Sequence, residues 1–343
     1  MQEKNKPFPL GKLPAEYLAR LLARFSLGDP RVILGPKVGE DAAVLDMGDR
    51  YLVAKSDPIT FASDAIGWYA VHVNANDVAC AGATPRWFLA TVLLPQERAD
   101  GTMVDDIFAQ ITQACEEVGA TLVGGHTEIT FGLDRPILVG VMLGEVAPER
   151  LVTTGGARSG DAVLLTSRVA VEATAIIARE KRDELSASHG LSDGELDRCA
   201  NFLYDPGISV VRAAKVATDS ASIHAMHDPT EGGLATGLWE LATAAGVGLE
   251  IDAEAIPVYS ETRVLCDVYG LDPLGVIGSG SLLLTLDGTD VGRVCDALAE
   301  AGIEAAVIGQ VVSPERGVVL RREGQQTVPL PTFDRDEIAR LFD

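Results

Sequence analysis

Residues 64–94 read DAIGWYAVHVNANDVACAGATPRWFLATVLL, and this stretch indicates the fold class. Apolar residues recur at helical spacing through 64–81, which predicts a helix that Gly82 and Pro85 end. The apolar run at 87–94 predicts a strand that follows directly. A helix and a strand in succession are typical of a mixed α/β protein.

The same alternation extends in both directions from this stretch. Near the N-terminus, Tyr17, Leu21 and Phe25 share one face of a predicted amphipathic helix. The segment 182–200, rich in charge and Ser, is predicted as an exposed helix or loop. Further strands are predicted at 42–47, 51–56, 120–125, 136–144, 161–167, 222–226, 247–251, 281–286 and 305–312. Further helices are predicted at 102–118, 170–181, 205–218, 229–246, 260–270 and 289–301.

A break near the middle of the chain divides this pattern into two halves. Pro148 and the run Thr154-Gly155-Gly156 interrupt it, and 343 residues suffice for two domains. The predicted fold class is therefore α/β (α+β) with two domains. The predicted parts are a helical leader at 1–35, an N-terminal domain at 36–150, a C-terminal domain at 156–315 and a C-terminal tail at 316–343.

Composition excludes several classes of partner. Hydrophobic residues make up 47% of the chain and the mean hydropathy is +0.18, which is typical of a well-packed protein. The net charge of −22 repels nucleic acid and anionic membrane surfaces, so we expect neither as a partner. No apolar run approaches the ~18 residues that a membrane span needs.

Cysteine usage indicates the compartment. The five cysteines are widely spaced and form no CxxC pair, which predicts reduced thiols in a cytoplasmic protein. The first residues, MQEKNKPFPLGKL, lack the apolar core of a signal peptide.

Four acidic segments carry candidate chemistry. Gly39-Glu40-Asp41 precedes a predicted strand, Lys55-Ser56-Asp57 follows one, Asn76-Asp77 lies inside a helix, and Gly124-Gly125-His126-Thr127-Glu128 is placed at a strand end. Hard oxygen ligands suit Mg²⁺, which is usually held by one or two carboxylates together with substrate phosphates. Glycines beside them would let backbone amides approach phosphate oxygens.

Each acidic residue also has a purely structural explanation. Asp41 and Asp57 are ordinary turn residues when taken singly. Asp77 lies between Val73 and Val78 on an apolar helix face, so its carboxylate needs a partner there.

The histidines are open to two explanations as well. His126 is either a hydrogen-bonded structural residue or a ligand, and in an extended chain it points to the same side as Glu128. His224 and His227 form an HxxH pair, which is weak evidence for zinc without a nearby Cys or third His.

The motif HDPTEGGL at 227–234 is predicted to open a helix. Asp228 is the expected N-cap, Pro229 the first helical residue and Glu231 the partner in a capping box. A helix N-terminus followed by Gly232 and Gly233 would equally suit a ligand phosphate or its metal ion. The motif alone does not separate these explanations.

Several common nucleotide and hydrolase motifs are absent from the sequence. There is no G-x-x-x-x-G-K-[ST], no G-x-G-x-x-G after a first strand and no G-x-S-x-G. P-loop, dinucleotide-binding and serine-hydrolase functions therefore lose support.

Taken in order, the motifs resemble a known family. The succession GEDAA (39–43), SD (56–57), NANDVACAGATP (74–85), GGHTE (124–128), SGDAVLLT (159–166) and DPTEGGLATGLWELA (228–242) is similar to the aminoimidazole ribonucleotide synthetase superfamily. The resemblance covers roughly residues 36–315 and is greatest for its hydrogenase-maturation branch, HypE. That branch carries DPTRGGLA where this chain has DPTEGGLA, and segments like GLDPL (270–274) and IGQV (308–311).

The resemblance implies a fold, ligands and partners. It implies two α/β domains whose N-terminal sheets pair in a homodimer, with ATP in a cleft at the dimer interface. It implies that the N-terminal domain binds ATP and Mg²⁺. The implied metal ligands are Asp41, Asp57, Asp77 and Glu128. The implied nucleotide-binding residues are Gly39, Asn76, Gly124, Gly125, Asp228, Gly232 and Gly233. The candidate catalytic residues are His126 and His227, whose ordinary pKa suits a general base.

The chain departs from the HypE pattern at two places. Glu231 stands where that branch has an arginine, which changes the local charge by two units. The sequence ends Arg340-Leu341-Phe342-Asp343, whereas that branch ends in a cysteine that carries a carbamoyl group to be dehydrated. We therefore expect the acceptor to be an unknown small group or a thiol supplied by a partner protein.

Three functions remain open. The first is an ATP- and Mg²⁺-dependent enzyme that phosphorylates or dehydrates a small acceptor group, in the manner of hydrogenase expression and formation. The second is a non-catalytic nucleotide-binding partner protein of a maturation complex. The third, a thiamine-monophosphate-type kinase, is disfavoured because the GGDT motif is absent.

Overall fold

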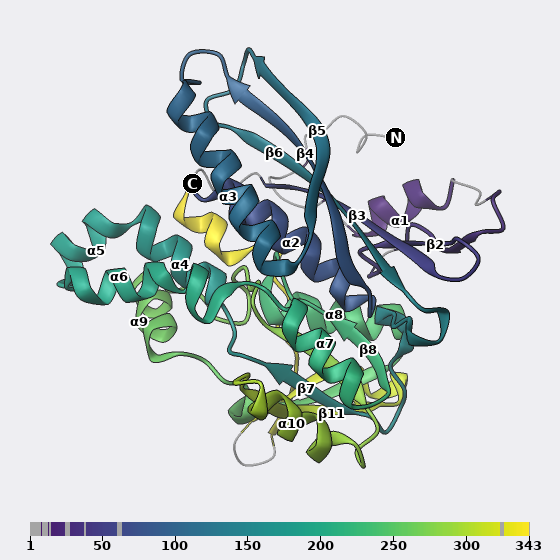
Figure 1. Ribbon diagram of the computed structural model, residues 1–343. Helices are drawn as coiled ribbons and strands as arrows, with labels where there is room; N and C mark the ends of the chain where they lie inside the picture. Colours follow the sequence, from purple (N-terminus) through teal and green to yellow (C-terminus); the bar gives the residue numbers. More distant parts are fainter. Residues whose placement is uncertain are drawn as a thin grey trace, which may run out of the picture.

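The computed structural model describes residues 8, 13, 15–24, 28–37, 39–59, 64–322 and 326–342. Two mixed sheets with helices packed against them form the molecule, as Figure 1 shows. The predicted two-domain α/β (α+β) class is confirmed. In the described part of the chain, no helix is long and apolar enough to cross a membrane.

The N-terminal sheet has six strands in the order β1-β2-β3-β6-β4-β5. Neighbouring strands are antiparallel, except β4 and β5, which are parallel. Their bounds are β1 Val32–Leu34, β2 Ala43–Asp46, β3 Tyr51–Ile59, β4 Thr84–Pro95, β5 Thr121–Thr130 and β6 Ile137–Val146. Strand β5 therefore forms one edge of this sheet.

Helix α2 (Ile66–Cys80) lies between the N-terminal sheet and the C-terminal domain (Figure 1). Nearly all of its residues are buried, including the polar side chains of His72, Asn74, Asn76 and Asp77. Glycines in β6 let it approach closely, because a Cβ at Gly140 would lie 2.5 Å from Asn74 Nδ2 and one at Gly144 would lie 2.4 Å from Val78 Cγ1. The residues on α2 are therefore held rigidly at the domain boundary.

The C-terminal sheet has seven strands in the order β13-β12-β9-β11-β7-β10-β8. Its neighbours are antiparallel apart from the parallel pair β12 and β9. Their bounds are β7 Ala162–Thr166, β8 Ile223–His227, β9 Gly248–Asp252, β10 Leu282–Leu286, β11 Ala305–Val312, β12 Val318–Arg322 and β13 Gln326–Pro329. The sheet thus continues beyond residue 315, where we had placed the start of a tail.

The remaining helices pack around these sheets. Their bounds are α1 Ala15–Leu22, α3 Gly101–Val118, α4 Val171–Glu180, α5 Arg182–His189, α6 Asp193–Asn201, α7 Val211–Ser220, α8 Gly233–Ala245, α9 Ser260–Tyr269 and α10 Val291–Glu300. Short helical turns are η2 Pro148–Arg150, η3 Thr154–Gly156, η4 Leu203–Gly207, η5 Ala253–Ala255, η6 Pro314–Arg316 and η8 Glu337–Leu341.

The structure confirms most predicted elements and changes four of them. The helix predicted at 205–218 begins only at Val211, because Asp205 has a non-helical φ of −143° and Leu203–Gly207 forms the separate turn η4. Asp57 and the GGHTE segment lie inside β3 and β5 and not in turns, because both strands run on past the residues we took as their ends. Segment 182–200, left open as helix or loop, forms α5 and α6. Helix α8 starts at Gly233 and not at 229. Phe25, assigned to the first amphipathic helix, lies outside the described residues.

Candidate functional site: an acidic cluster between the domains

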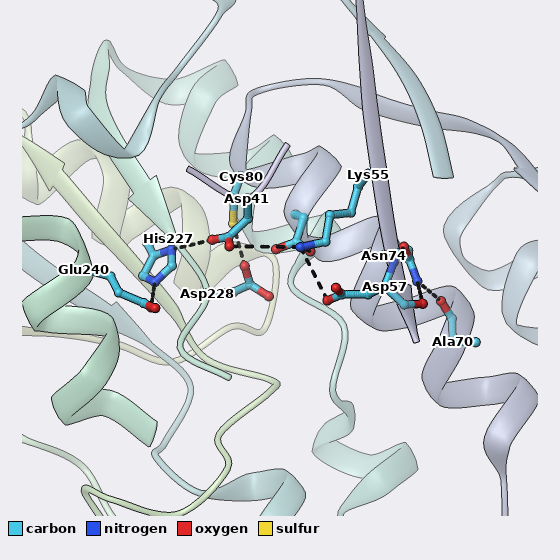
Figure 2. A network of polar contacts seen from close by, with 10 residues as sticks. Asp41, Lys55, Asp57, Ala70, Asn74, Cys80, His227, Asp228 and Glu240 are labelled. Carbon is cyan, nitrogen blue, oxygen red and sulfur yellow. Dashed lines mark hydrogen bonds and ion pairs between the residues drawn. The ribbon is translucent and has the colours of Figure 1, made fainter. Parts of the chain in front are cut away.

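Three carboxylates, those of Asp41, Asp57 and Asp77, meet around the ammonium group of Lys55, and a fourth, that of Asp228, lies beside Asp77 and Asp41; we call these five residues the acidic cluster. Asp41 precedes β2, Asp57 lies in β3, Asp77 lies in α2, and Asp228 follows β8 of the C-terminal domain. Lys55 and Asp57 are two residues apart on β3 and so share one face of the sheet. Figure 2 shows Asp41, Lys55, Asp57 and Asp228 turned towards a common region.

Lys55 is the cation at the centre of this cluster. Its Nζ lies 2.9 Å from Asp77 Oδ2, 3.4 Å from Asp57 Oδ2 and 4.0 Å from Asp41 Oδ1. Burial opposes the charged ammonium, but the three carboxylates outweigh it and raise the pKa of Lys55 well above its usual value. Lys55 is therefore a permanent positive charge at this position.

The cluster has a buried end and an open end. The side chains of Asp77 and Lys55 are 5% and 10% exposed, while those of Asp41 and Asp57 are 36% and 38% exposed. Burial raises the pKa of Asp77 to about 6, although Lys55 acts in the opposite direction. Burial, together with repulsion from Asp77 and Asp41, raises the pKa of Asp228 well above its usual value. A ligand can thus reach the cluster from the side of Asp41 and Asp57.

The donors of this cluster fit a hard cation. Asp228 Oδ1 accepts a hydrogen bond from Cys80 Sγ at 3.4 Å, whereas its buried Oδ2 finds no hydrogen-bond partner among the described residues. An unpaired buried carboxylate oxygen is costly, and one ammonium group does not balance four carboxylates. In the described ranges, however, no three His, Cys, Asp or Glu side chains are arranged so that they could hold a metal ion by themselves. The arrangement therefore suits an ion that takes part of its ligands from a substrate, as Mg²⁺ does.

His227 is fixed between two carboxylates. Its Nδ1 lies 3.4 Å from Asp41 Oδ2 and its Nε2 lies 2.9 Å from Glu240 Oε2 (Figure 2). The ring is buried at the end of β8, directly before Asp228. This placement brings a predicted catalytic residue to the cluster, with each ring nitrogen facing a carboxylate.

The segment that carries Asp41 is anchored to the C-terminal domain. Glu40 accepts hydrogen bonds from the backbone N–H groups of Thr154 at 3.3 Å and Gly155 at 3.0 Å. Gly39 has φ +84°, and a Cβ there would lie 3.0 Å from the carbonyl oxygen of Glu240 in α8. In the sequence, 154–156 indicates only a break between the domains, so we did not predict that its backbone amides bind Glu40.

The two asparagines of α2 have different roles. Asn76, predicted to bind the nucleotide, instead joins the domains: its Nδ2 donates to Ile208 O and its Oδ1 accepts from Val210 N, both at 2.8 Å. Asn74, which we did not predict, accepts from the backbone N–H of Asp57 at 2.8 Å. It therefore orients the strand that carries Asp57 and Lys55. Asn74 lies four residues after Ala70 and so on the same buried face of the helix, and a polar side chain on that face was the signal that could have identified it.

The loop 228–233 does not form the capping box we predicted. Gly232 and Gly233 have φ of +80° and +64°, so the chain cannot follow a right-handed helical path from residue 229 and α8 starts only at Gly233. A Cβ at Gly233 would lie 2.5 Å from Val276 O and 2.6 Å from Leu274 O, which explains why glycine is needed there. Asp228 consequently does not cap α8 and is directed into the acidic cluster.

The predicted residues of β5 lie away from the acidic cluster. His126 Nε2 is 3.4 Å from Glu128 Oε2, and both side chains are exposed. Strands β6 and β4 separate β5 from β3, a distance of roughly 14 Å across the sheet. A Cβ at Gly125 would lie 1.9 Å from Ala90 O, so this glycine serves strand pairing; Gly124 lies beside it. The binding and catalytic roles that we predict for Gly124, Gly125, His126 and Glu128 stay predictions.

The HxxH pair is divided between two networks. His224 Nδ1 lies 2.9 Å from both carboxylate oxygens of Asp161, and its Nε2 lies 3.2 Å from Arg158 Nη1. His227 instead faces the acidic cluster. The two rings therefore do not converge on one zinc site.

Comparisons with known proteins agree with this architecture. The family model for the N-terminal domain of AIR synthase related proteins matches residues 39–146, and the model for their C-terminal domain matches 158–321. Carbamoyl dehydratase HypE of Cupriavidus necator is 31% identical over 83% of this chain and 80% of that protein. Carbamoyl dehydratase HypE of Azotobacter vinelandii is 30% identical over 90% of this chain and 87% of that protein.

Solved structures show the same relationship. The crystal structure of hydrogenase maturation protein HypE in complex with ATP superposes with a TM-score of 0.72 at 26% identity, covering 93% of this chain and 95% of that chain. The resemblance indicated by the ordered motifs is therefore confirmed. This chain belongs to the AIR synthase related protein family, and its relatives there include carbamoyl dehydratases of the HypE type.

Proposed function

We propose that this protein is an ATP- and Mg²⁺-dependent enzyme that phosphorylates or dehydrates a small acceptor group during hydrogenase maturation. The supporting observation is the acidic cluster, in which four carboxylates from both domains converge and leave one buried oxygen unpaired. Relatives at 30% identity or more are named carbamoyl dehydratase, and one solved relative is described as an ATP complex.

The four carboxylates are the groups that would hold magnesium. Asp77 and Asp228 supply the buried oxygens, and Asp41 and Asp57 supply those open to solvent. Bound Mg²⁺ would offset the charge of the phosphoryl oxygens. Lys55 keeps the carboxylates together before ATP binds and gives a second positive charge for the phosphates.

Two neighbouring features serve binding and positioning. His227 contacts Asp41 through one ring nitrogen and Glu240 through the other. It therefore sets the direction of the Asp41 carboxylate. The glycine at position 39 lets the segment that carries Asp41 pack closely against α8, where a Cβ would lie 3.0 Å from the carbonyl oxygen of Glu240. The acceptor would enter on the exposed side of Asp41 and Asp57, as a small group or as a thiol of a partner protein.

The active form would be a homodimer that pairs through β5. This edge strand and its following turn expose three large apolar side chains, namely Val123 at 53%, Ile129 at 61% and Phe131 at 84%. An exposed apolar edge strand favours association with another strand. A second copy on this edge would bring His126 and Glu128 towards the partner's nucleotide and give the predicted catalytic and ligand roles a location.

The cysteines are consistent with a reducing cytoplasm, which we include in the proposal. All five are free thiols, and four are buried. Cys80 lies beside Asp228 of the acidic cluster, but burial raises its pKa well above the usual range, so it remains a hydrogen-bond donor to Asp228.

ATP turnover tests this function directly. The protein is incubated with ATP and Mg²⁺, with and without an S-carbamoylated cysteine peptide, and released ADP or AMP is measured. We expect nucleotide release that requires the peptide, stops with EDTA and returns when Mg²⁺ is added. Tight ATP binding with no turnover in any of these mixtures would instead support the non-catalytic partner protein.

A further inference from the structure

The side-chain carboxylate of Asp336, near the C-terminus, binds the loop that carries Asp228. Asp336 lies just before the turn η8, and it is buried, with only 4% of its surface exposed. Its Oδ2 accepts a hydrogen bond from the backbone N–H of Gly232 at 2.6 Å. Its Oδ1 accepts from the N–H of Ile277 at 3.2 Å and of Ile338 at 2.9 Å. One side chain thus binds three chain segments.

These hydrogen bonds connect two loops, 228–233 and 274–278, that also bind each other through backbone hydrogen bonds. Gly232 and Gly233 both have positive φ, a conformation that is flexible unless neighbouring groups fix it. Thr230 O accepts from the N–H groups of Gly233 at 2.9 Å and Gly278 at 3.1 Å. Asp336 closes the arrangement from the opposite side, because it binds Gly232 of one loop and Ile277 of the other.

The C-terminal segment itself is firmly attached, which makes Asp336 a fixed support. Glu337 N donates to Gly275 O at 3.0 Å, and Arg340 Nη1 donates to Gly270 O at 3.1 Å. Ile338 is buried in the same apolar core as residues of α2 and α4. In Figure 1 this turn is the yellow segment beside those helices.

We propose that Asp336 is a positioning residue for the nucleotide site, in that it fixes the 228–233 loop and thereby the direction of the Asp228 carboxylate. The proposal rests on the proposed function, since Asp228 is there a magnesium ligand. It also changes the expected role of Gly232, whose N–H is engaged by Asp336 and is not free for a phosphate oxygen. Asp336 touches neither nucleotide nor metal, and it acts through the loop.

The test compares Asp336→Asn with Asp334→Asn, a matched change at an exposed aspartate of the same segment. Asparagine keeps the size of the side chain but turns one acceptor oxygen into an N–H₂ donor, which faces backbone donors. We expect hydrogen–deuterium exchange, measured without nucleotide, to rise at 230–233 and 275–278 in Asp336→Asn only. We expect its Kd for Mg·ATP to rise about tenfold, with Asp334→Asn unchanged.

A second variant keeps the test decisive if Asp336→Asn does not fold. Asp336→Glu retains the carboxylate but displaces it by one methylene, so its Mg·ATP affinity should be lower than that of the wild type, with faster exchange at 230–233 and 275–278. Faster exchange in the loops with unchanged ATP affinity would overturn the positioning role and leave Asp336 only structural. Wild-type protein that binds no Mg·ATP would overturn the proposed function, while the exchange data would still report whether Asp336 orders the loop.

Discussion

The acidic cluster and the His126–Glu128 pair stand on the same six-stranded sheet, yet their surroundings are opposite. The cluster draws side chains from both domains and encloses Asp77 and Asp228, whereas the pair on β5 faces solvent at the sheet edge. Both sets contain acidic groups within short motifs. The difference shows that a motif supplies chemical groups, while the elements packed against it decide whether those groups form a site.

Contacts between the domains enclose the acidic cluster. Asn76 fixes α2 to the chain before α7, and Glu40 fixes the Asp41 segment to the amides at 154–155. Strand β5 has no corresponding cover from the described residues of its own chain, since its Ile129 and the following Phe131 are exposed. The comparison therefore predicts that the cluster is assembled within one chain and that the β5 pair acts on the cluster of a second copy.

Asp77→Asn should give the largest effect, because it removes the buried ligand that also binds Lys55 at 2.9 Å. We expect Mg·ATP affinity to fall about 1000-fold, equivalent to about 4 kcal/mol, as measured by titration calorimetry. Asp105→Asn, at an exposed position of α3, is the matched control and should bind normally. Unchanged affinity in Asp77→Asn would show that the cluster does not hold the metal.

Most of the fold was predictable because its signals are local. Apolar periodicity located the elements of both sheets, and β11 begins and ends where the sequence indicated. The start of helix α8 was misplaced because the sequence offers two signals there, a capping-box pattern at 228–231 and the glycines at 232–233. The carbonyl groups of Leu274 and Val276, which leave no room for a Cβ at Gly233, favour the start at the glycines. Those carbonyls lie about forty residues further along the chain, beyond the reach of a local pattern.

The candidate site was predictable in its acidic residues and not in their supports. Asp41, Asp57 and Asp77 could be singled out by the order of their motifs and the family resemblance, although each has a structural explanation when taken singly. Lys55, Asn74 and Asp336 could not, since each depends on a contact that only the folded chain makes. The homodimer remains a prediction, because a contact with a second copy leaves only an exposed surface on one chain.

Glu172 is a buried carboxylate without a lysine partner, and so differs from Asp77 of the acidic cluster, which is paired with Lys55. It lies in α4 and accepts from Ser279 N at 3.2 Å, and burial, opposed by the Ser279 hydrogen bonds, raises its pKa from 4.5 to about 7. Between these values the folded protein keeps a proton that the unfolded chain releases. Stability should therefore be highest below this window and fall as pH rises through it, by roughly 3 kcal/mol.

Replacing this group should remove its part of the pH dependence. Glu172→Gln imitates the protonated acid, so we expect its unfolding free energy to exceed that of the wild type by roughly 3 kcal/mol at pH 8 and to match it near pH 5. Urea unfolding at both pH values measures this. Glu180→Gln, on the exposed end of the same helix, should leave the wild-type slope intact. Parallel slopes for wild type and Glu172→Gln would mean that Glu172 is ionised in the folded state.

Phe131→Glu should break the proposed dimer at the β5 edge. Phe131 is 84% exposed, and a charge there would oppose burial against a second copy. We expect the wild type to have twice the 36.1 kDa mass of one chain by light scattering, and the variant to dissociate about thirtyfold more readily, equivalent to about 2 kcal/mol. Val264→Glu, at an exposed apolar residue of α9, should remain dimeric.

Mixing two inactive variants then tests whether the β5 pair serves the partner's cluster. Asp77→Asn lacks the cluster and Glu128→Gln lacks the pair, so each homodimer should turn over little ATP. If the two sets combine across the interface, a mixed dimer contains one complete site, and an equal mixture should recover about a quarter of wild-type turnover. Recovery requires that subunits exchange and form mixed dimers. Because Phe131→Glu weakens the dimer, the same mixture with this change in both chains should stay inactive. No recovery from exchanging dimers would place Glu128 outside the site and leave the acidic cluster to act within a single chain.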